Sequence, residues 1–460
     1  MERSRTIFSR AFFMGLFLMA VMVYMTLSAH AANISPNGSY SGSLTEETTK
    51  CEYTFTLAQS GRLDIDFTSD SDAYDISMII RGSEKDKYDF YYFYVKNSRE
   101  SIAYDLAAGK YTFVVEKNHP SYNGSFSFNS SFSPAEETYT GDNNTIDSVK
   151  NGAAVPFGKT IKGHLAMNDS SDYYKVVLPS PGKLTISVHS DIGKLDLFVK
   201  NANESIIDDL GDFEAGDKSF ICDYDAGTCF IDFERWNELY TGTYSFSLSF
   251  EPTGEKYDGN DDSVDAVRNR AGVPFCTWNK GLLARNDIND FYKVTIPQTG
   301  KYKLEINSSI NLIYNGIQNG SKESIYYEKQ YKGLKNRTLT LKKGVYFMNF
   351  TRYDRSSTGT YSFCITLCGA SLSKVKGGKK SVKVTWKKGT ANGYEIQIAK
   401  NRKFTKGLKT LTVKNAGAKS KTIKKLKSKK AYYVRMRSFI KSEGHKYYSD
   451  WSKVKKVKVK

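Results

Sequence analysis

The sequence is poor in the residues and patterns that indicate helices, a disulfide framework or catalysis. Its 460 residues include only 9 prolines, 6 cysteines and 5 histidines. No long stretch repeats apolar residues every three or four positions, which excludes an architecture built from amphipathic helices. Tyrosine and phenylalanine are abundant instead, and Gly, Ser, Thr, Asn and Asp separate short apolar runs. This composition favours strands joined by turns, so we expect an all-β protein.

Long apolar runs are confined to the N-terminus. Three arginines precede the run AFFMGLFLMAVMVYMTLS, and the small residues Ala29 and Ala31 follow it. This order predicts a signal peptide over residues 1–31. A retained membrane anchor is the alternative, because 18 apolar residues lie at the short end of what spans a bilayer. No second such run follows, so we expect a secreted or cell-surface protein without a membrane span in its mature form.

The cysteines are too few for a dense disulfide framework, although their place after the signal suits an oxidising compartment. Cys222 and Cys229 flank DYDAGT, whose Ala-Gly step is typical of a turn. We therefore predict a local disulfide between these two residues. The alternative for all six cysteines is a role as small buried apolar residues.

Most of the chain consists of a repeated unit. The segment YTGDNNTIDSVKNGAAVPF at residues 139–157 matches YDGNDDSVDAVRNRAGVPF at 257–275. Both units close on similar words, GTYSFSLSF at 242–250 and GTYSFCITL at 359–367, and a divergent first unit closes on GSFSFNSSF at 124–132. Self-similarity of this kind indicates tandem copies of one domain. We expect repeat 1 at residues 33–134, repeat 2 with its linker at 135–252, and repeat 3 with its linker at 253–368.

Within each repeat the pattern predicts strands. Leu184, Ile186 and Val188 alternate with polar residues after a Pro-Gly turn, which is the period-two pattern of a half-buried strand. About 95 residues of such strands bury enough apolar surface to fold alone as a two-sheet sandwich. We expect tandem β-sandwiches.

Five short words recur in the same order along repeats 2 and 3. They are an Asn/Asp-rich linker such as GNDDSVDA, a Gly-x-Leu step, Asp-x-x-Asp-[Tyr/Phe]-Tyr-Lys-Val, a Gly-Lys turn and a final Gly-x-Tyr-x-Phe strand. Together they resemble the bacterial pre-peptidase C-terminal domain, over most of residues 135–367 in two copies and over repeat 1 more weakly. The resemblance implies small, jelly-roll-like modules that bind extracellular protein or polysaccharide and often accompany secreted peptidases.

The paired aspartates of these words are candidate metal ligands. The collagen-binding modules of clostridial collagenases, which are similar to this family, hold calcium between such a strand start and an acidic linker. Calcium prefers about six to eight oxygen ligands, which carboxylates and amides on turns supply. By that resemblance we expect repeat 3 to bind calcium through Asp258, Asn260, Asp261, Asp262, Asp287 and Asp290.

The other two repeats depart from this set. In repeat 2 a threonine replaces Asp258, and only Asp142, Asp169 and Asp172 bring charge, so we expect weaker binding. Repeat 1 has a threonine and Cys51 at the strand start and should not bind calcium. The alternative for repeats 2 and 3 is that the aspartates only accept backbone hydrogen bonds where the chain enters a strand.

Residues 369–460, the C-terminal module, differ from the repeats. The words SVKVTWKK, GYEIQIAKNRKF and KKAYYVRMRSF resemble a fibronectin type III domain, an immunoglobulin-like sandwich in which Trp386 and Tyr432 would be core residues. From Ser371 onward the chain has 29 Lys and Arg against three acids, whereas the rest has 38 bases and 46 acids. Such a charge attracts an anionic cell-wall polymer or glycan; a solvated face that protects a strand edge is the alternative. An exported protein is not expected to meet nucleic acid.

Catalytic signatures are missing. The chain has no His-Glu-x-x-His and no Gly-x-Ser-x-Gly, and no cysteine lies in a nucleophile context. His164 and His189 of repeat 2 stand where repeat 3 has Leu282 and Asn307, so a site shared by the repeats cannot use them. We expect a protein that is not an enzyme, either a binding protein for extracellular protein or polysaccharide or a structural spacer or accessory subunit for a secreted enzyme.

Overall fold

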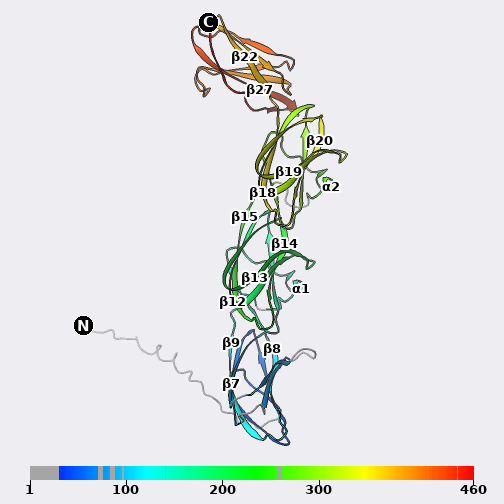
Figure 1. The fold of residues 1–460 in the computed structure, drawn as a ribbon, viewed down its shortest axis with the longest axis vertical. Coiled ribbons are helices and arrows are strands. Elements are labelled where there is room, and N and C mark those ends of the chain that lie inside the picture. The colour runs from blue at the N-terminus through cyan, green and yellow to red at the C-terminus, as the bar shows by residue number, and fades with distance from the viewer. Residues whose placement is uncertain are drawn as a thin grey trace, which may run out of the picture.

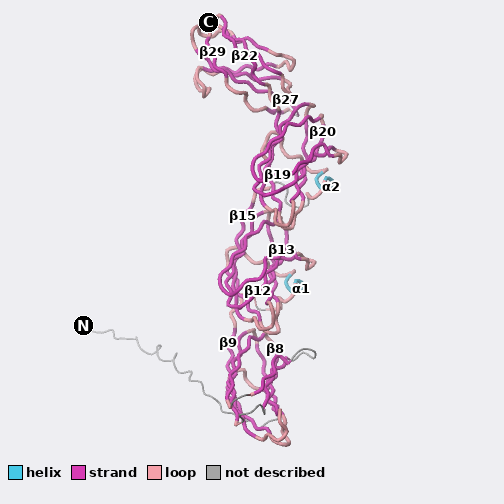
Figure 2. The backbone as a smooth tube through the Cα atoms, in the orientation of Figure 1, coloured by secondary structure: helices cyan, strands magenta, loops and turns pink. Residues whose placement is uncertain are grey.

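The computed structural model describes most of the chain after the predicted signal peptide. The described chain is almost entirely strands, as predicted, and its sheets form an elongated row of units from the N-terminal to the C-terminal end (Figures 1 and 2). Residues 1–30 of the predicted signal peptide and two predicted calcium ligands, Asp258 and Asn260, lie outside the described residues. The described residues are 31–70, 76–82, 89–95, 98–139, 141–255, 261–442 and 444–460.

Repeats 2 and 3 share one topology. The strand order is β10-β15-β12-β14-β11 in repeat 2 and β16-β21-β18-β20-β17 in repeat 3, and β13 and β19 pair with β12 and β18. In repeat 2 the elements are α1 (Ile146–Val149), β10 (Thr160–Leu165), β11 (Ser171–Leu178), β12 (Gly182–Lys200), β13 (Ile206–Tyr224), β14 (Gly227–Arg235) and β15 (Gly242–Pro252). In repeat 3 they are α2 (Val264–Val267), β16 (Asn279–Leu283), β17 (Asn289–Ile296), β18 (Gly300–Asn319), β19 (Ser324–Leu341), β20 (Gly344–Arg352) and β21 (Gly359–Leu367).

The long strand β12 joins two layers of a sandwich. Its first part pairs with β15 and its last part with β14, and its pairing with β13 shifts register between Ser190 and Lys194. β18 behaves in the same way, with the shift between Ser308 and Leu312. Repeats 2 and 3 are therefore two-layer β units, each closed by one long two-stranded ribbon.

Repeat 1 has the same plan with that ribbon divided. Its two sheets have the orders β1-β3-β8-β5-β6 and β2-β9-β4-β7, so that β4 and β5 together correspond to β12. The strands are β1 (Ala31–Asn33), β2 (Gly38–Leu44), β3 (Lys50–Leu57), β4 (Gly61–Ser69), β5 (Ile76–Gly82), β6 (Asp89–Tyr94), β7 (Arg99–Leu106), β8 (Gly109–Lys117) and β9 (Gly124–Pro134).

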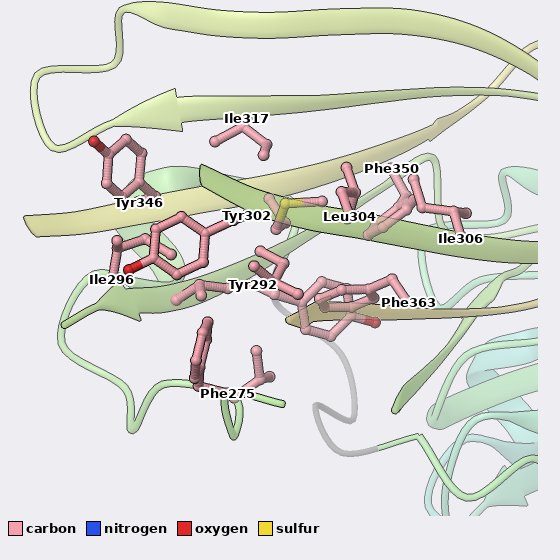
Figure 3. Packing of buried hydrophobic residues seen from close by; sticks show 14 of the residues in the cluster. Phe275, Tyr292, Ile296, Tyr302, Leu304, Ile306, Ile317, Tyr346, Phe350 and Phe363 are labelled. Atoms are coloured by element: carbon pink, nitrogen blue, oxygen red, sulfur yellow. The ribbon is translucent and has the colours of Figure 1, made fainter. Parts of the chain in front are cut away.

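The alternation seen in the sequence places each core between the layers. Leu184 and Ile186 of β12 are buried, while Lys183 and Ser187 on either side of them are exposed. Figure 3 shows the corresponding core of repeat 3, in which Tyr302, Phe350 and Phe363 lie among branched aliphatic side chains. Burial of such side chains, each worth about 1.5–3 kcal/mol, stabilises every repeat separately.

The C-terminal module forms two further sheets, with the orders β22-β23-β26 and β25-β24-β27-β28, and β29 pairs with β27. Trp386 and Tyr432 are buried, as predicted, and Tyr432 Oη accepts a hydrogen bond from the Lys427 backbone N–H at 3.2 Å. Ile440 of β27 belongs to the core of repeat 3, so the module packs on that repeat. Its strands are β22 (Ser371–Gly378), β23 (Ser381–Lys387), β24 (Gly393–Ala399), β25 (Lys409–Val413), β26 (Ser420–Ile423), β27 (Ala431–Ser442), β28 (His445–Tyr448) and β29 (Lys455–Lys458).

The junctions between successive repeats use equivalent contacts. At the first, the Met167 N–H donates to the Asp105 carbonyl at 3.0 Å, and the Thr241 hydroxyl donates to the Asp105 carboxylate at 2.7 Å. At the second, the Arg285 N–H donates to the Asp223 carbonyl at 2.8 Å. Thr358 faces the Asp223 carboxylate there at 3.4 Å, as Thr241 faces Asp105. Repeats 2 and 3 are therefore stacked in one orientation, and Figure 1 shows α1 and α2 on the same side of the row.

The described part of the chain contains two helices, each of four residues. Neither is long or apolar enough to cross a membrane.

Candidate functional site

The linker of repeat 3 folds back onto the start of β17. The Phe291 N–H donates to the Asp261 carbonyl at 2.9 Å, which fixes the linker beside the strand. Helix α2 follows directly, and its N-cap Ser263 accepts a hydrogen bond from the Ala266 N–H at 3.2 Å. Val264 and Val267 bury against Phe347. A capped and packed helix thus holds the acidic linker over the paired aspartates.

Three carboxylates of repeat 3 converge. One oxygen from each of Glu255, Asp261 and Asp290 lies within 4.8 Å of the others. Asp290 is 0% and Asp261 2% exposed. Oδ1 of Asp290 and Oδ2 of Asp261 have no hydrogen-bond donor among the described residues. Buried carboxylate oxygens without donors are costly, so this arrangement requires protons or a cation.

Two tyrosines complete this group. Tyr361 donates its hydroxyl to Oδ2 of Asp290 and lies 2.9 Å from the hydroxyl of Tyr292. Tyr292 in turn donates to Glu255, whose second oxygen accepts the Leu282 N–H at 3.0 Å. These donors orient the carboxylates while leaving the oxygens described above open.

Burial and mutual repulsion raise the pKa values of these acids. Burial raises the pKa of Glu255 to about 9, of Asp261 to about 8 and of Asp287 to about 7, and nearby carboxylates add to each rise. The pKa of Asp290 is raised well above its usual range, by burial and then by Glu255 and Asp287. Without a counter-ion the cluster therefore retains protons near neutral pH.

The remaining predicted ligands of repeat 3 lie at the edge of this cluster. Asp287 is buried and accepts the Asn289 N–H at 3.1 Å. Asp262 is exposed, yet it is close enough to Asp287 to raise the pKa of that residue. The backbone-accepting role that we left open for the aspartates thus applies to Asp287, but not to the open oxygen of Asp290.

Repeat 2 assembles a smaller version. Asn143 stands where repeat 3 has Asp261, and its carbonyl accepts the Tyr173 N–H at 2.7 Å. Burial raises the pKa of Asp169 to about 7, and it raises that of Asp172 well above its usual range. Asp142 is exposed, and its carboxylate accepts the Asn144 N–H at 3.1 Å, so it caps the linker turn.

The tyrosine arrangement of repeat 3 recurs in repeat 2. Tyr244 donates to the Asp172 carboxylate and lies 2.8 Å from the hydroxyl of Tyr174. Glu137, the counterpart of Glu255, accepts the Ser60 hydroxyl of repeat 1 at 2.5 Å. Both copies therefore place an aspartate over two hydroxyls, but the glutamate of repeat 2 has a different partner.

Repeat 1 replaces this polar group by apolar residues. Cys51 and Phe126 stand at the positions of Asp172 and Tyr244, and both are 3% exposed. The hydroxyl of Tyr53 donates to the Ser41 carbonyl at 3.2 Å instead. The structure therefore offers no carboxylate at this position of repeat 1.

The glutamates and tyrosines were missed in the sequence. Glu137 and Glu255 each stand two residues before the segments that we aligned, at Tyr139 and Tyr257. Extending that alignment by two residues would have identified the glutamates. The closing Gly-x-Tyr-x-Phe word contains the tyrosine that bonds the aspartate, but nothing local in the sequence indicates that contact.

The predicted disulfide between Cys222 and Cys229 is not formed, and both thiols are free. Cys222 lies on β13 opposite Leu184 of β12, whereas Cys229 lies on β14 opposite Val176 of β11. The strands on either side of the Ala-Gly turn therefore do not pair with each other, and the two cysteines lie opposite different strands. Burial raises the pKa of both thiols to about 12.

Comparisons with known proteins give partial likenesses of fold. No family model matches the chain, and no curated protein matches it. The pre-peptidase C-terminal domain of a collagenase from Bacillus anthracis is 19% identical over 23% of this chain and 100% of that chain, with a TM-score of 0.20. A β-1,2-glucanase from Parabacteroides distasonis is 11% identical over 37% of this chain and 30% of that chain, with a TM-score of 0.18. A myokine structure is 18% identical over 20% of this chain and 95% of that chain, with a TM-score of 0.16.

Proposed function

We propose that repeat 3 binds a calcium ion through the carboxylates of its linker and of the start of β17. The observation that carries this proposal is the convergence of Glu255, Asp261 and Asp290, two of which have buried oxygens without donors. The donor set consists of hard oxygens, which suits calcium better than a metal that prefers nitrogen or sulfur. Asp287 and Asp262 supply further oxygens beside it.

The affinities should differ between the repeats. Repeat 2 has an amide, Asn143, at the position of Asp261, and its Glu137 is bonded to Ser60. Fewer charged ligands give weaker calcium binding. Repeat 1, with Cys51 at the position of the central aspartate, should bind none.

Isothermal titration calorimetry on the whole mature chain tests this ranking. We expect one tight calcium site in the wild type, which Asp261→Asn together with Asp290→Asn removes. The matched control is Asp265→Asn in the same linker, because Asp265 is exposed and pairs with Lys322 at 2.7 Å. Calcium binding that persists in the double variant, or that the control variant also loses, would refute the assignment.

We further propose that the protein is secreted and binds extracellular protein or polysaccharide without catalysing a reaction. This proposal rests on the resemblance of the repeats to binding modules and on the basic C-terminal module. The three lysines of β29 flank the buried Val457. Lys456 and Lys458 are exposed, and Lys455 is half-buried. They favour attraction to an anionic cell-wall polymer or glycan. Retention on purified cell wall that does not weaken as salt rises would contradict this electrostatic role.

The stacked repeats favour a second candidate, a structural spacer or accessory subunit for a secreted enzyme. The equivalent contacts at Asp105 and Asp223 hold successive repeats in one orientation, which suits a rod that sets a distance. Screening the mature chain against arrays of glycans and matrix proteins separates the two. Specific binding supports the first candidate, and its absence across both arrays supports the spacer.

A further inference from the structure

In repeats 2 and 3 one long strand forms an open edge of the sheets. β13 has 19 residues and β19 has 18, and each pairs with a single strand, β12 or β18, among the described residues. An open edge presents unpaired backbone N–H and C=O groups, which can pair with another chain unless charge or shape prevents it. Both edges bend at equivalent glycines, Gly216 with φ 121° and Gly333 with φ 109°. An unbroken ladder of backbone hydrogen bonds is therefore not expected, and the side chains must decide what binds.

The two equivalent edges carry opposite charge. β13 contains six acidic residues and one lysine, whereas β19 contains four basic residues and one glutamate. Of the acids, Asp208 is buried against Arg285 and Asp223 lies at the junction with repeat 3, so four remain exposed on the edge. The charge also differs in sign at an equivalent position of the two strands. Asp212 lies opposite Asp196, and its counterpart Lys329 lies opposite Tyr314, the residue that matches Asp196 in the repeat alignment. The same place in the fold has thus become acidic in one repeat and basic in the next.

Part of this charge already has partners within the chain. Asp212 pairs with Lys194 at 2.8 Å, and Asp217 contacts His189 at 2.8 Å. On β19, the Lys329 ammonium lies 4.8 Å from the centre of the Tyr353 ring. These contacts are at the surface, where ion pairs are worth at most about 1 kcal/mol, so they do not prevent the groups from meeting a partner.

Exposed apolar side chains accompany the charges. On β19, Tyr327 is 58%, Tyr331 60% and Leu334 60% exposed, and on β13 Ile221 is 62% exposed. Tyrosines and aliphatic side chains surrounded by charge are the composition of protein–protein contacts. Both edges therefore suit a protein partner with a complementary edge.

The stacking of the repeats determines which partner fits. Because repeats 2 and 3 have one orientation in the row (Figure 1), β13 and β19 follow the same side of the rod in the same direction. A second copy placed parallel and in register would set acid against acid and base against base, which repels. A second copy rotated by a two-fold axis between repeats 2 and 3 sets β13 of each copy along β19 of the other, and the strands then run antiparallel.

We propose that two copies of this chain associate antiparallel, through two identical contacts between the acidic β13 edge of one copy and the basic, tyrosine-bearing β19 edge of the other. The β13 edge of each copy contacts the β19 edge of the other, so both contacts are the same. The interface is therefore self-complementary, and the assembly closes as a dimer. This inference does not depend on calcium or on the proposed ligand class.

Sedimentation equilibrium of the mature chain tests the dimer. We expect dimers at about 50 mM salt that dissociate at about 500 mM, because the contact is largely electrostatic. Reversing the acidic edge with Asp209→Lys, Asp212→Lys and Glu214→Lys should weaken dimerisation about tenfold or more. Reversing the basic edge with Lys329→Glu, Lys332→Glu and Lys335→Glu should do the same.

Combining all six substitutions in one chain restores opposite signs and should restore the dimer. A matched control reverses three lysines of β29 with Lys455→Glu, Lys456→Glu and Lys458→Glu, and it should leave the dimer unchanged. A wild-type chain that is monomeric at low salt would overturn the proposal. So would a dimer that ignores both edge variants. A dimer weakened by the β13 and β29 reversals but not by the β19 reversal would also overturn the proposal, because it would identify the C-terminal module as the partner of the acidic edge.

Discussion

Repeat 1 and repeat 3 fill the same buried position of the sandwich with opposite kinds of residue, apolar in repeat 1 and charged in repeat 3. At the start of the equivalent strand, repeat 3 buries Asp290 under the hydroxyl of Tyr361, whereas repeat 1 buries Cys51 beside Phe126. The aspartate and its tyrosine are lost together, as expected if neither is useful without the other. A buried carboxylate needs donors, and a buried hydroxyl needs an acceptor. The comparison shows that the sandwich folds without this polar group, so fold alone does not explain its presence in repeat 3.

The largest effect is expected when the aspartate alone is placed in repeat 1. Cys51→Asp should destabilise that repeat by about 3–5 kcal/mol, because it leaves a buried charge without a partner. Adding Phe126→Tyr should recover about 1 kcal/mol through one hydrogen bond. Hydrogen exchange of β3 in the full chain measures both effects, with Cys51→Ala as the uncharged control. Equal exchange in the aspartate and alanine variants would contradict this account.

The reciprocal exchange gives repeat 3 the residues of repeat 1. Asp290→Cys with Tyr361→Phe should weaken calcium binding by about a hundredfold or more, equivalent to about 2.7 kcal/mol. The calcium-free protein should keep its stability, since the change removes a buried charge along with its donor. Calorimetry measures the calcium affinity, and thermal unfolding without calcium measures the stability. Unfolding of the calcium-free variant would show that the polar group is structural.

Repeat 2 is intermediate between the other two repeats, because it keeps the central aspartate but lacks one carboxylate of the linker. Asn143→Asp supplies the carboxylate that repeat 3 has at Asp261, and we expect about tenfold tighter calcium binding by repeat 2, or about 1.4 kcal/mol. Asn151→Asp adds the same charge at an exposed position of the same linker and should change little. Similar gains from both substitutions would mean that net charge, rather than the position, determines affinity.

The last expected difference between the repeats concerns pH dependence and needs no substitution. Burial raises the pKa of Asp261 to about 8 and of Asp287 to about 7, so folded repeat 3 binds protons more tightly than its unfolded chain. Without calcium its stability is therefore greatest at low pH and falls as pH rises from about 4 through these values, by about 1.4 kcal/mol per pH unit for each of these carboxyls. Hydrogen exchange of β17 should show this slope, and exchange of β3 in repeat 1 should not. Saturating calcium should remove the slope, and a slope that persists would exclude these carboxylates as ligands.

The sequence predicted the fold class and half of the cluster because both follow from local patterns. Alternation along segments such as Leu184 to Val188 identified the strands, and the paired aspartates recurred at a fixed offset. The contacts of Asp290 could not be predicted, because its tyrosine lies 71 residues away in the sequence, on β21, the last strand of the repeat. Strand pairing also decided against the disulfide, since Cys222 faces β12 and Cys229 faces β11. Local spacing gives no information about such pairings.

The same junction joins repeat 1 to repeat 2 and repeat 2 to repeat 3. Strand β7 of repeat 1 offers the carbonyl of Asp105, and strand β13 of repeat 2 offers that of Asp223. The next repeat donates the N–H of Met167 or Arg285 to it. A copy inserted between two repeats would meet a fitting surface on both sides. Gene duplication could therefore lengthen the rod by whole units without evolving a new interface, and the distance between its two ends would grow in equal steps.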